Sequence, residues 1–185
     1  MELTKIFRYY KKLPGAIYIL FFAKMVNSMG AFVYPFLTIY FTKTLSLEES
    51  TAGFFVMLAI TARAPGMLLG GRLSDSFGRK KILILFQSLA AICLIPCAYL
   101  ESSLLIPRLL ILSSFFQGAA QPASMAMATD LSNPKNRKAA FSLLYLGNNI
   151  GFAVGPLIAG FLYNNYLKWI FLGDAVTTFA SLLLV

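Results

Sequence analysis

Histidine is absent from this 185-residue sequence, and cysteine and acidic residues are scarce, at two and seven. Without histidine there is no His relay and no His-containing metal site. Cys93 and Cys97 lie four residues apart in an apolar segment, where we expect small packing side chains rather than a disulfide or a metal pair. The sequence also has no G-x-x-x-x-G-K-[ST] phosphate loop and no identifiable nucleophile–base pair. It therefore predicts a protein that is not an enzyme and holds no metal or cofactor.

Charged residues of both signs are few as well. They make up 12% of the chain, against about 25% in soluble domains, while 58% of residues are hydrophobic and the mean hydropathy is +0.74. Such a chain is expected in a membrane, where each helix needs about 20 apolar residues and satisfies its own backbone hydrogen bonds. The sequence predicts an all-α membrane protein with a single six-helix bundle over residues 1–185, its helices at about 16–40, 47–71, 80–100, 104–128, 139–163 and 167–185.

Two segment starts carry capping signals. Ser46 and Glu49 have the spacing of a capping box ahead of the second segment. Asn133 and Pro134 predict an N-cap and a first-turn proline for the fifth segment. We expect both helices to begin at these residues, outside the apolar part of each segment.

The basic residues indicate the orientation. Most of the 16 Lys and Arg fall on one side of the predicted bundle, which the positive-inside rule assigns to the cytoplasm together with both termini. The net charge of +9 thus reflects the membrane topology and does not indicate nucleic-acid binding. It implies only a weak attraction to anionic lipid head groups. The residues on that side are Lys5, Arg8, Lys11, Lys12, Arg72, Arg79, Lys80, Lys81, Lys135, Arg137 and Lys138, and those on the other side are Lys43, Arg108 and Lys168.

The connection between the second and third segments has an ordered pattern, GRLSDSFGRKK. An ordinary positive-inside loop explains its bases but not the Gly-x-Leu-x-Asp spacing. The pattern resembles the loop between helices 2 and 3 of the major facilitator superfamily (MFS), G-x-L-a-D-r-x-G-r-k, from which Ser76 departs. The matching residues are Gly71, Leu73, Asp75, Gly78, Arg79 and Lys80.

Small residues recur every fourth position in two segments, which lets helix backbones approach closely. Ala62, Gly66, Gly70 and Ser74 do so in the second segment. The fifth segment also resembles the helix-5 motif of MFS drug:proton antiporters, g-x-x-x-G-P-x-x-G-G, in which the proline bends the helix. The resemblance implies that both segments face an opposite half and permit rocking. The fifth-segment residues are Gly147, Gly151, Gly155, Pro156, Ala159 and Gly160.

The resemblance carries further expectations. It implies the N-terminal bundle of the MFS fold, built from two three-helix inverted repeats, with a C-terminal six-helix half expected but absent from this sequence. It also implies a charge network of Asp75, Arg79 and Asp130 at the end of the fourth segment.

Polar side chains follow one face of the first segment and one face of the fourth. Two explanations remain open: hydrogen bonds between helices, or a shared aqueous cavity. The resemblance favours the cavity, because helices 1 and 4 line it in the MFS fold. The candidate cavity and substrate residues are Lys24, Asn27, Tyr34, Gln117, Gln121 and Asn148.

Three charged residues fall inside the predicted spans, where each costs about 2.5–3.5 kcal/mol on insertion scales. Lys24 and Arg63 either extend toward the interface or line the cavity. Asp174 is expected to have a structural role, with Arg108 as a possible partner. It is also the one acidic candidate for proton coupling.

These observations predict membrane transport of a small molecule by alternating access, in the plasma membrane. The leading hypothesis is the N-terminal half of a proton-coupled multidrug-type efflux carrier. One departure weakens antiport: Ser114 stands where drug antiporters have a helix-4 arginine. The alternatives are an uptake carrier or facilitator for a small solute, and a non-transporting fragment that needs a C-terminal partner.

Overall fold

The computed structural model describes residue 10 and residues 13–100 and 103–185, and its regular elements there are helices. They fall in the six predicted segments. Four of the basic residues assigned to the cytoplasmic side lie outside the described residues: Lys5, Arg8, Lys11 and Lys12. The elements are α2 (Gly15–Met29), α3 (Val33–Ile39), a π-helix η1 (Tyr40–Thr44), α4 (Glu49–Thr61), α5 (Arg63–Phe77), α6 (Arg79–Cys97), α7 (Leu105–Asp130), α8 (Arg137–Asn165) and α9 (Lys168–Leu184).

Four helical stretches of the described chain are long and apolar enough to cross a membrane. They are Gly15–Thr44, Glu49–Phe77, Arg79–Cys97 and Arg137–Tyr163. The helix α9 has 17 residues, and α7 carries several polar side chains along its 26 residues. The count of six membrane spans therefore stays a prediction.

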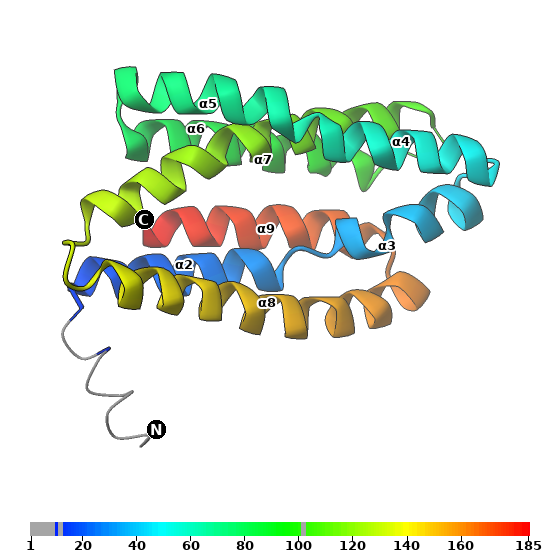
Figure 1. The fold of residues 1–185 in the computed structure, drawn as a ribbon. Helices are drawn as coiled ribbons and strands as arrows, with labels where there is room; N and C mark the ends of the chain where they lie inside the picture. Colours follow the sequence, from blue (N-terminus) through cyan, green and yellow to red (C-terminus); the bar gives the residue numbers. More distant parts are fainter. Residues whose placement is uncertain (1–9, 11–12, 101–102) are drawn as a thin grey trace.

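The helices form two packed groups (Figure 1). In one group, α5 and α6 pack against α7, and in the other α8 and α9 pack against α2. Contacts between α6 and α9 join the groups. The turn between α5 and α6, the connection between α7 and α8, and the chain end at Val185 lie at one end of the bundle (Figure 1).

The largest buried cluster lies around α3, toward the opposite end. Phe41, Leu94, Ile106, Leu110 and Phe171 are among its members. Cys93 and Cys97 are buried free thiols in α6. Large side chains thus fill this end, whereas small ones dominate the contacts of α5 and α8 described below.

The first segment is broken, although the sequence predicted one continuous helix. Residues between α2 and α3 leave the helical path, and α3 begins at Val33. Pro35 has no backbone N–H and its ring clashes with the carbonyl four residues earlier, at Ala31. The break places Pro35 in the first turn of α3, where a missing N–H costs nothing.

Both predicted capping signals are wrong in detail. The helix α4 begins at Glu49 after Glu48, and Ser46 has a φ of 53°, outside the helix. The helix α8 begins at Arg137. Asn133 instead caps a preceding turn, because its Oδ1 accepts hydrogen bonds from the N–H groups of Lys135 and Asn136, both at 3.0 Å.

Candidate functional site

The turn between α5 and α6 consists of a single residue, Gly78. It follows the last residue of α5 and precedes the first of α6, with φ at +96°. Glycine adopts this conformation without steric cost. Its N–H donates to the carbonyl of Ser74 (3.1 Å), so the motif glycine reverses the chain in minimal length.

Arg79 connects this turn to the end of α7. Its Nη2 lies 3.3 Å from Oδ1 of Asp75, and its Nε lies 3.0 Å from Oδ2 of Asp130. The structure therefore brings together the three residues of the expected charge network. The carboxylates are 74% and 57% exposed, and exposed ion pairs contribute about 0–1 kcal/mol each. Stability alone gives little reason for this arrangement.

The other motif residues have separate surroundings. Leu73 packs against the buried cluster of Ile82, Leu83 and Phe86, and a Cβ on Gly71 would meet only Pro122, at 3.9 Å. Lys80 is exposed. Ser76, the departure from the motif, donates a hydrogen bond to the carbonyl of Arg72 (3.1 Å).

The small-residue stripes of α5 and α8 pack inside the bundle, as their spacing predicts; that the two helices also face a second half stays a prediction of the resemblance. A Cβ on Gly151 would lie 2.6 Å from the carbonyl oxygen of Met25, and Gly147 and Gly155 also press against α2. Gly66 and Gly70 press against the backbone of α7. The small side chains are used because these helix pairs touch backbone to backbone. Along α8, Ala159 is also buried, whereas Pro156 and Gly160 are half-buried.

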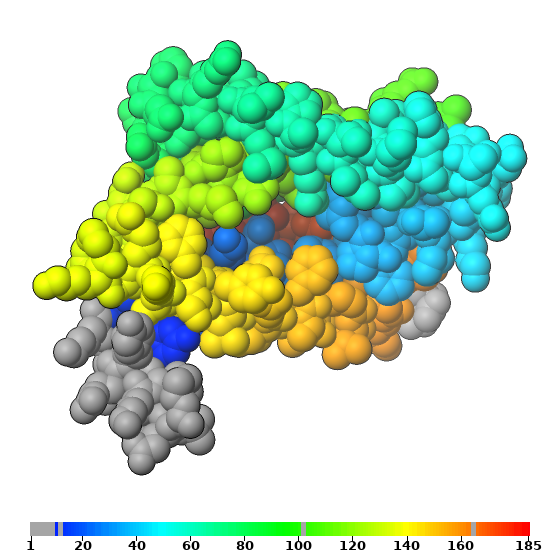
Figure 2. All heavy atoms as spheres, in the orientation of Figure 1, coloured from blue at the N-terminus to red at the C-terminus, as the bar shows by residue number. Residues whose placement is uncertain are grey.

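A polar cavity of about 90 Å³ lies among α2, α6, α7, α8 and α9. Three of the six candidate residues line it: Lys24, Asn27 and Asn148. In Figure 2 the face between α7 and α8 is hollowed, with α2 and α9 at its floor. The remaining lining residues are Leu20, Ala23, Ser28, Leu83, Gln87, Ser124, Leu144, Ser181 and Val185.

Two hydrogen bonds position the amides of this cavity. Asn27 donates from Nδ2 to the hydroxyl of Thr178 (3.1 Å), and Ser28 donates to Oδ1 of Asn148 (2.9 Å). The two bonds tie α2 to α9 and to α8. Two alternatives were open for the polar face of the first segment: hydrogen bonds between helices, or a cavity. Both occur, because Asn27 and Ser28 line the cavity and also bond to neighbouring helices.

Tyr34 and Gln117 belong to a different cluster, centred on Arg63. The guanidinium carbon of Arg63 lies 4.7 Å from the Tyr34 ring centroid, and its Nη2 donates to Oε1 of Gln117 (3.1 Å). The hydroxyls of Tyr34 and Ser114 share a hydrogen bond of 2.8 Å. The charge of Arg63 is thus partnered by an aromatic face and an amide oxygen. Gln121 lies exposed and lines neither site.

The sequence analysis did not select Gln87 and Ser181, which also line the cavity. Gln87 lies in a largely apolar part of α6. Ser181 follows Asp174 and Thr178 at helical spacing, so the three form a buried polar stripe on α9. A polar residue within a membrane helix was the available signal for Gln87, and this stripe was the signal for Ser181.

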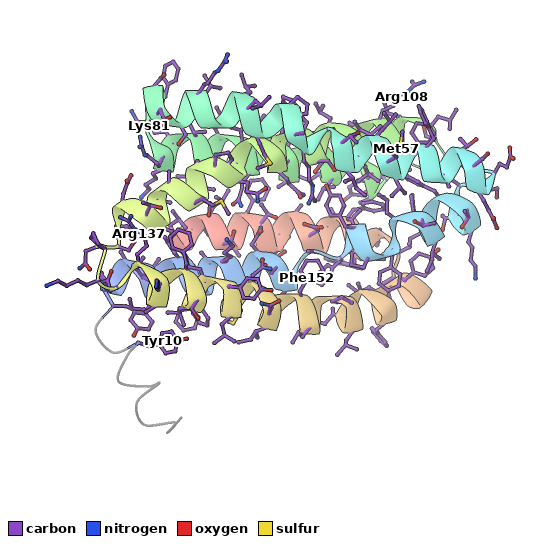
Figure 3. All side chains as sticks on the ribbon, viewed as in Figure 1. Tyr10, Met57, Lys81, Arg108, Arg137 and Phe152 are labelled. Carbon is purple, nitrogen blue, oxygen red and sulfur yellow. The ribbon has the colours of Figure 1, made fainter. Side chains whose placement is uncertain are left out.

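Asp174 is buried, at 3% exposure, and is not paired with Arg108 as expected. Its carboxylate lies near the backbone of Phe32 and Val33, at the break before α3. Its Oδ2 has no hydrogen-bond partner among the described residues. Arg108 is exposed, and Figure 3 shows it at the outer edge of the bundle, beside the start of α7. Asp174 therefore neighbours the break before α3 and not Arg108.

Relatives that this chain resembles in sequence are named as transporters. The chain is 32% identical over 165 residues to the uncharacterized MFS-type transporter YttB of Bacillus subtilis (strain 168), covering 89% of this chain and 41% of that protein. It is 34% identical to the 3-(3-hydroxy-phenyl)propionate transporter of Escherichia coli (strain K12), covering 69% and 31%. Further relatives, 26–29% identical, are named as a Na(+), Li(+), K(+)/H(+) antiporter and as multidrug resistance proteins.

The fold has a solved counterpart. A crystal structure of the peptide transporter POT (E310Q mutant, with sulfate) superimposes with a TM-score of 0.77 at 22% identity, covering 97% of this chain and 40% of that one. The chain spans 41% and 31% of the lengths of the two relatives described first. The family and these relatives are transporters, not enzymes. The model of the Major Facilitator Superfamily matches residues 20–185, and the chain belongs to this family of membrane transporters.

Proposed function

We propose that this chain is the N-terminal six-helix half of a carrier that moves small molecules by alternating access. The observation that carries the proposal is the polar cavity on the hollowed face between α7 and α8, lined by Lys24, Asn27 and Asn148 from two helices. Polar groups at membrane depth need a wet or protein-covered face. A second six-helix half placed over this face would complete a central site.

The Arg79 network is proposed as the contact that responds to this second half. Asp75 is largely exposed although it pairs with Arg79. The N-terminus of a helix carries a partial positive charge. An exposed carboxylate at the end of this bundle can therefore interact favourably with the N-terminus of a helix from another bundle. We infer that Asp75 holds the two halves together in one access state.

Proton-coupled efflux is our first choice of transport mode. The Gly-Pro pattern of α8 and the relatives named as multidrug efflux proteins and as a cation/proton antiporter support it. Asp174 is the proposed proton-binding group, since it is a buried carboxylate with a free oxygen at a helix break.

Uptake or facilitated movement of a small solute is the second candidate. Ser114 replaces the helix-4 arginine of the antiporter pattern, and it bonds to Tyr34 rather than facing the cavity. The relative named as a 3-(3-hydroxy-phenyl)propionate transporter supports this candidate. A third candidate is a fragment that moves nothing until a C-terminal partner binds it.

Flux measurements distinguish the three candidates. The chain alone, and the chain joined to the C-terminal remainder of the Bacillus relative, are reconstituted in vesicles with and without a pH gradient. Efflux requires substrate movement against its gradient driven by protons. Movement that ignores the pH gradient favours the solute carrier. If only the joined protein moves substrate, the chain is a fragment that needs its C-terminal partner. If neither protein moves substrate, the proposal is contradicted.

Cysteine accessibility tests the cavity itself. Asn27→Cys and Asn148→Cys are compared with Leu85→Cys, an exposed apolar position on α6 that we assign to lipid. The cavity positions are expected to react faster with a water-soluble thiol reagent. Equal rates at all three positions would remove the observation on which the proposal depends.

We further propose that the carrier lies in the plasma membrane with both termini in the cytoplasm. The basic α5–α6 turn would then face the cytoplasm. A membrane-impermeant reagent should label Ser76→Cys in inside-out vesicles and not in intact cells, and the reverse pattern would invert the topology.

A further inference from the structure

Lys24 is the one charged side chain among the residues that line the polar cavity. No hydrogen bond or ion pair within the described part of the chain engages its ammonium group. Arg63, the other basic residue within the spans, is held by Tyr34 and Gln117 in a separate cluster. The ammonium of Lys24 is therefore available to a molecule in the cavity.

Acidic side chains are missing from the same lining. Glu48 and Glu49 lie at the start of α4, and Asp75 and Asp130 lie at the opposite end of the bundle, around Arg79. Asp174 is buried against the break before α3 and does not line the cavity. The lining side chains of the described chain thus carry one positive charge and no negative charge, and the terminal carboxylate of Val185 is replaced by a neutral peptide bond in the joined protein.

Hydrogen-bond donors lie in the cavity together with the positive charge of Lys24. Asn148 accepts a hydrogen bond from the Ser28 hydroxyl at its Oδ1. This bond uses neither of the two N–H donors of the Asn148 amide. The Lys24 ammonium has three donors. Donors from α2 and α8 consequently meet at one cavity.

An unpaired ammonium at membrane depth is costly, and the low dielectric strengthens its attraction to an opposite charge. We propose that the cavity binds the anionic group of a carboxylate-bearing solute, with Lys24 as the residue that selects it. This inference rests on the proposed transport function and specifies its substrate class. A cationic solute would meet repulsion there, with no acid to offset it.

The test measures the local potential at Ser124, which lines the same cavity. Ser124→Cys is introduced with Cys93 and Cys97 replaced by alanine. Its reaction rates with the anionic sulfonatoethyl and the cationic trimethylammonium-ethyl methanethiosulfonates are each divided by that reagent's rate with a free small thiol. We expect the corrected rate of the anionic reagent to be about tenfold higher.

Matched substitutions assign the effect to one side chain. Lys24→Met should abolish the preference, and Lys24→Arg should keep it. Lys43→Met, which removes an exposed base in η1, should leave it unchanged. Because each ratio comes from a single variant, partial misfolding affects both reagents alike. Equal rates in the starting protein, or a preference that survives Lys24→Met, would overturn the proposal.

Protection identifies the ligand class. Benzoate should slow labelling of Ser124→Cys, whereas benzamide and benzylamine, which are similar in shape, should not. Slowing by benzylamine, or none by benzoate, contradicts a carboxylate site. These readouts require no transport. An anion-selective cavity in a joined protein without flux would contradict the proposed function alone, and flux without anion preference would contradict only this inference.

Discussion

Arg63 and Tyr34 form a cation–π pair across the bundle, with the guanidinium carbon 4.7 Å from the ring centroid. The pair connects the start of α5 to α3, just beyond the break in the first segment. It explains how an arginine is accommodated within a predicted span. The ring and the hydroxyl of Tyr34 are both engaged within the bundle, and Tyr34 does not line the polar cavity.

Tyr34→Leu should destabilise the chain more than Tyr34→Phe. Phenylalanine keeps a ring under Arg63 and loses the hydrogen bond to Ser114, worth about 0.5–1.5 kcal/mol. Leucine also loses the cation–π contact, worth about 0.5–2 kcal/mol more. Denaturant unfolding in detergent measures the difference, with the exposed Tyr145→Leu as control. Equal losses for the two Tyr34 variants would show that the ring contact contributes nothing.

Gly151→Ala should weaken the packing of α8 on α2. The added Cβ would lie 2.5 Å from Cβ of Ser28, so the helices must separate, at about 1–3 kcal/mol. Gly53→Ala is the matched control, because nothing lies within 4 Å of its added Cβ. There we expect a gain of about 0.5–1 kcal/mol from helix propensity. A neutral Gly151→Ala would mean that the α2–α8 contact is looser than the structure indicates.

Asp75→Asn should change the unfolding free energy of this chain by no more than about 1 kcal/mol, because its ion pair with Arg79 is exposed. The same change in a full-length relative should disrupt transport by unbalancing its two access states. The measurements are thermal unfolding of this chain and flux by the relative. A large fall in the melting temperature of the isolated chain would show that Asp75 acts locally and not between halves.

Asp174→Asn should be tolerated better than Asp174→Ala. Asparagine keeps the volume and a polar group beside the backbone of Phe32 and Val33, whereas alanine leaves a cavity at this buried position, which loosens the packing of the break. Hydrogen exchange at these two amides provides a local readout. They should exchange faster in Asp174→Ala and remain protected in Asp174→Asn. Unchanged protection in Asp174→Ala would show that the carboxylate does not hold the break.

Sequence alone located the six helical segments, because a long apolar run must satisfy its backbone internally. The loop pattern included Gly78, which forms the turn, and the family resemblance grouped Asp75, Arg79 and Asp130, which the structure brings together. Local patterns sufficed for the turn because its conformation depends on one residue, which has φ at +96°.

The tertiary structure decided how the polar residues divide. Lys24 and Tyr34 share one predicted helical face, yet the break around Ala31 sends them to different sites. The residues that contact Arg63 and Gly151 come from segments far away in the sequence. A periodic pattern records which residues share a face of one helix. Which helix covers that face depends on the packing of the whole bundle, and a pattern within a single segment does not encode it.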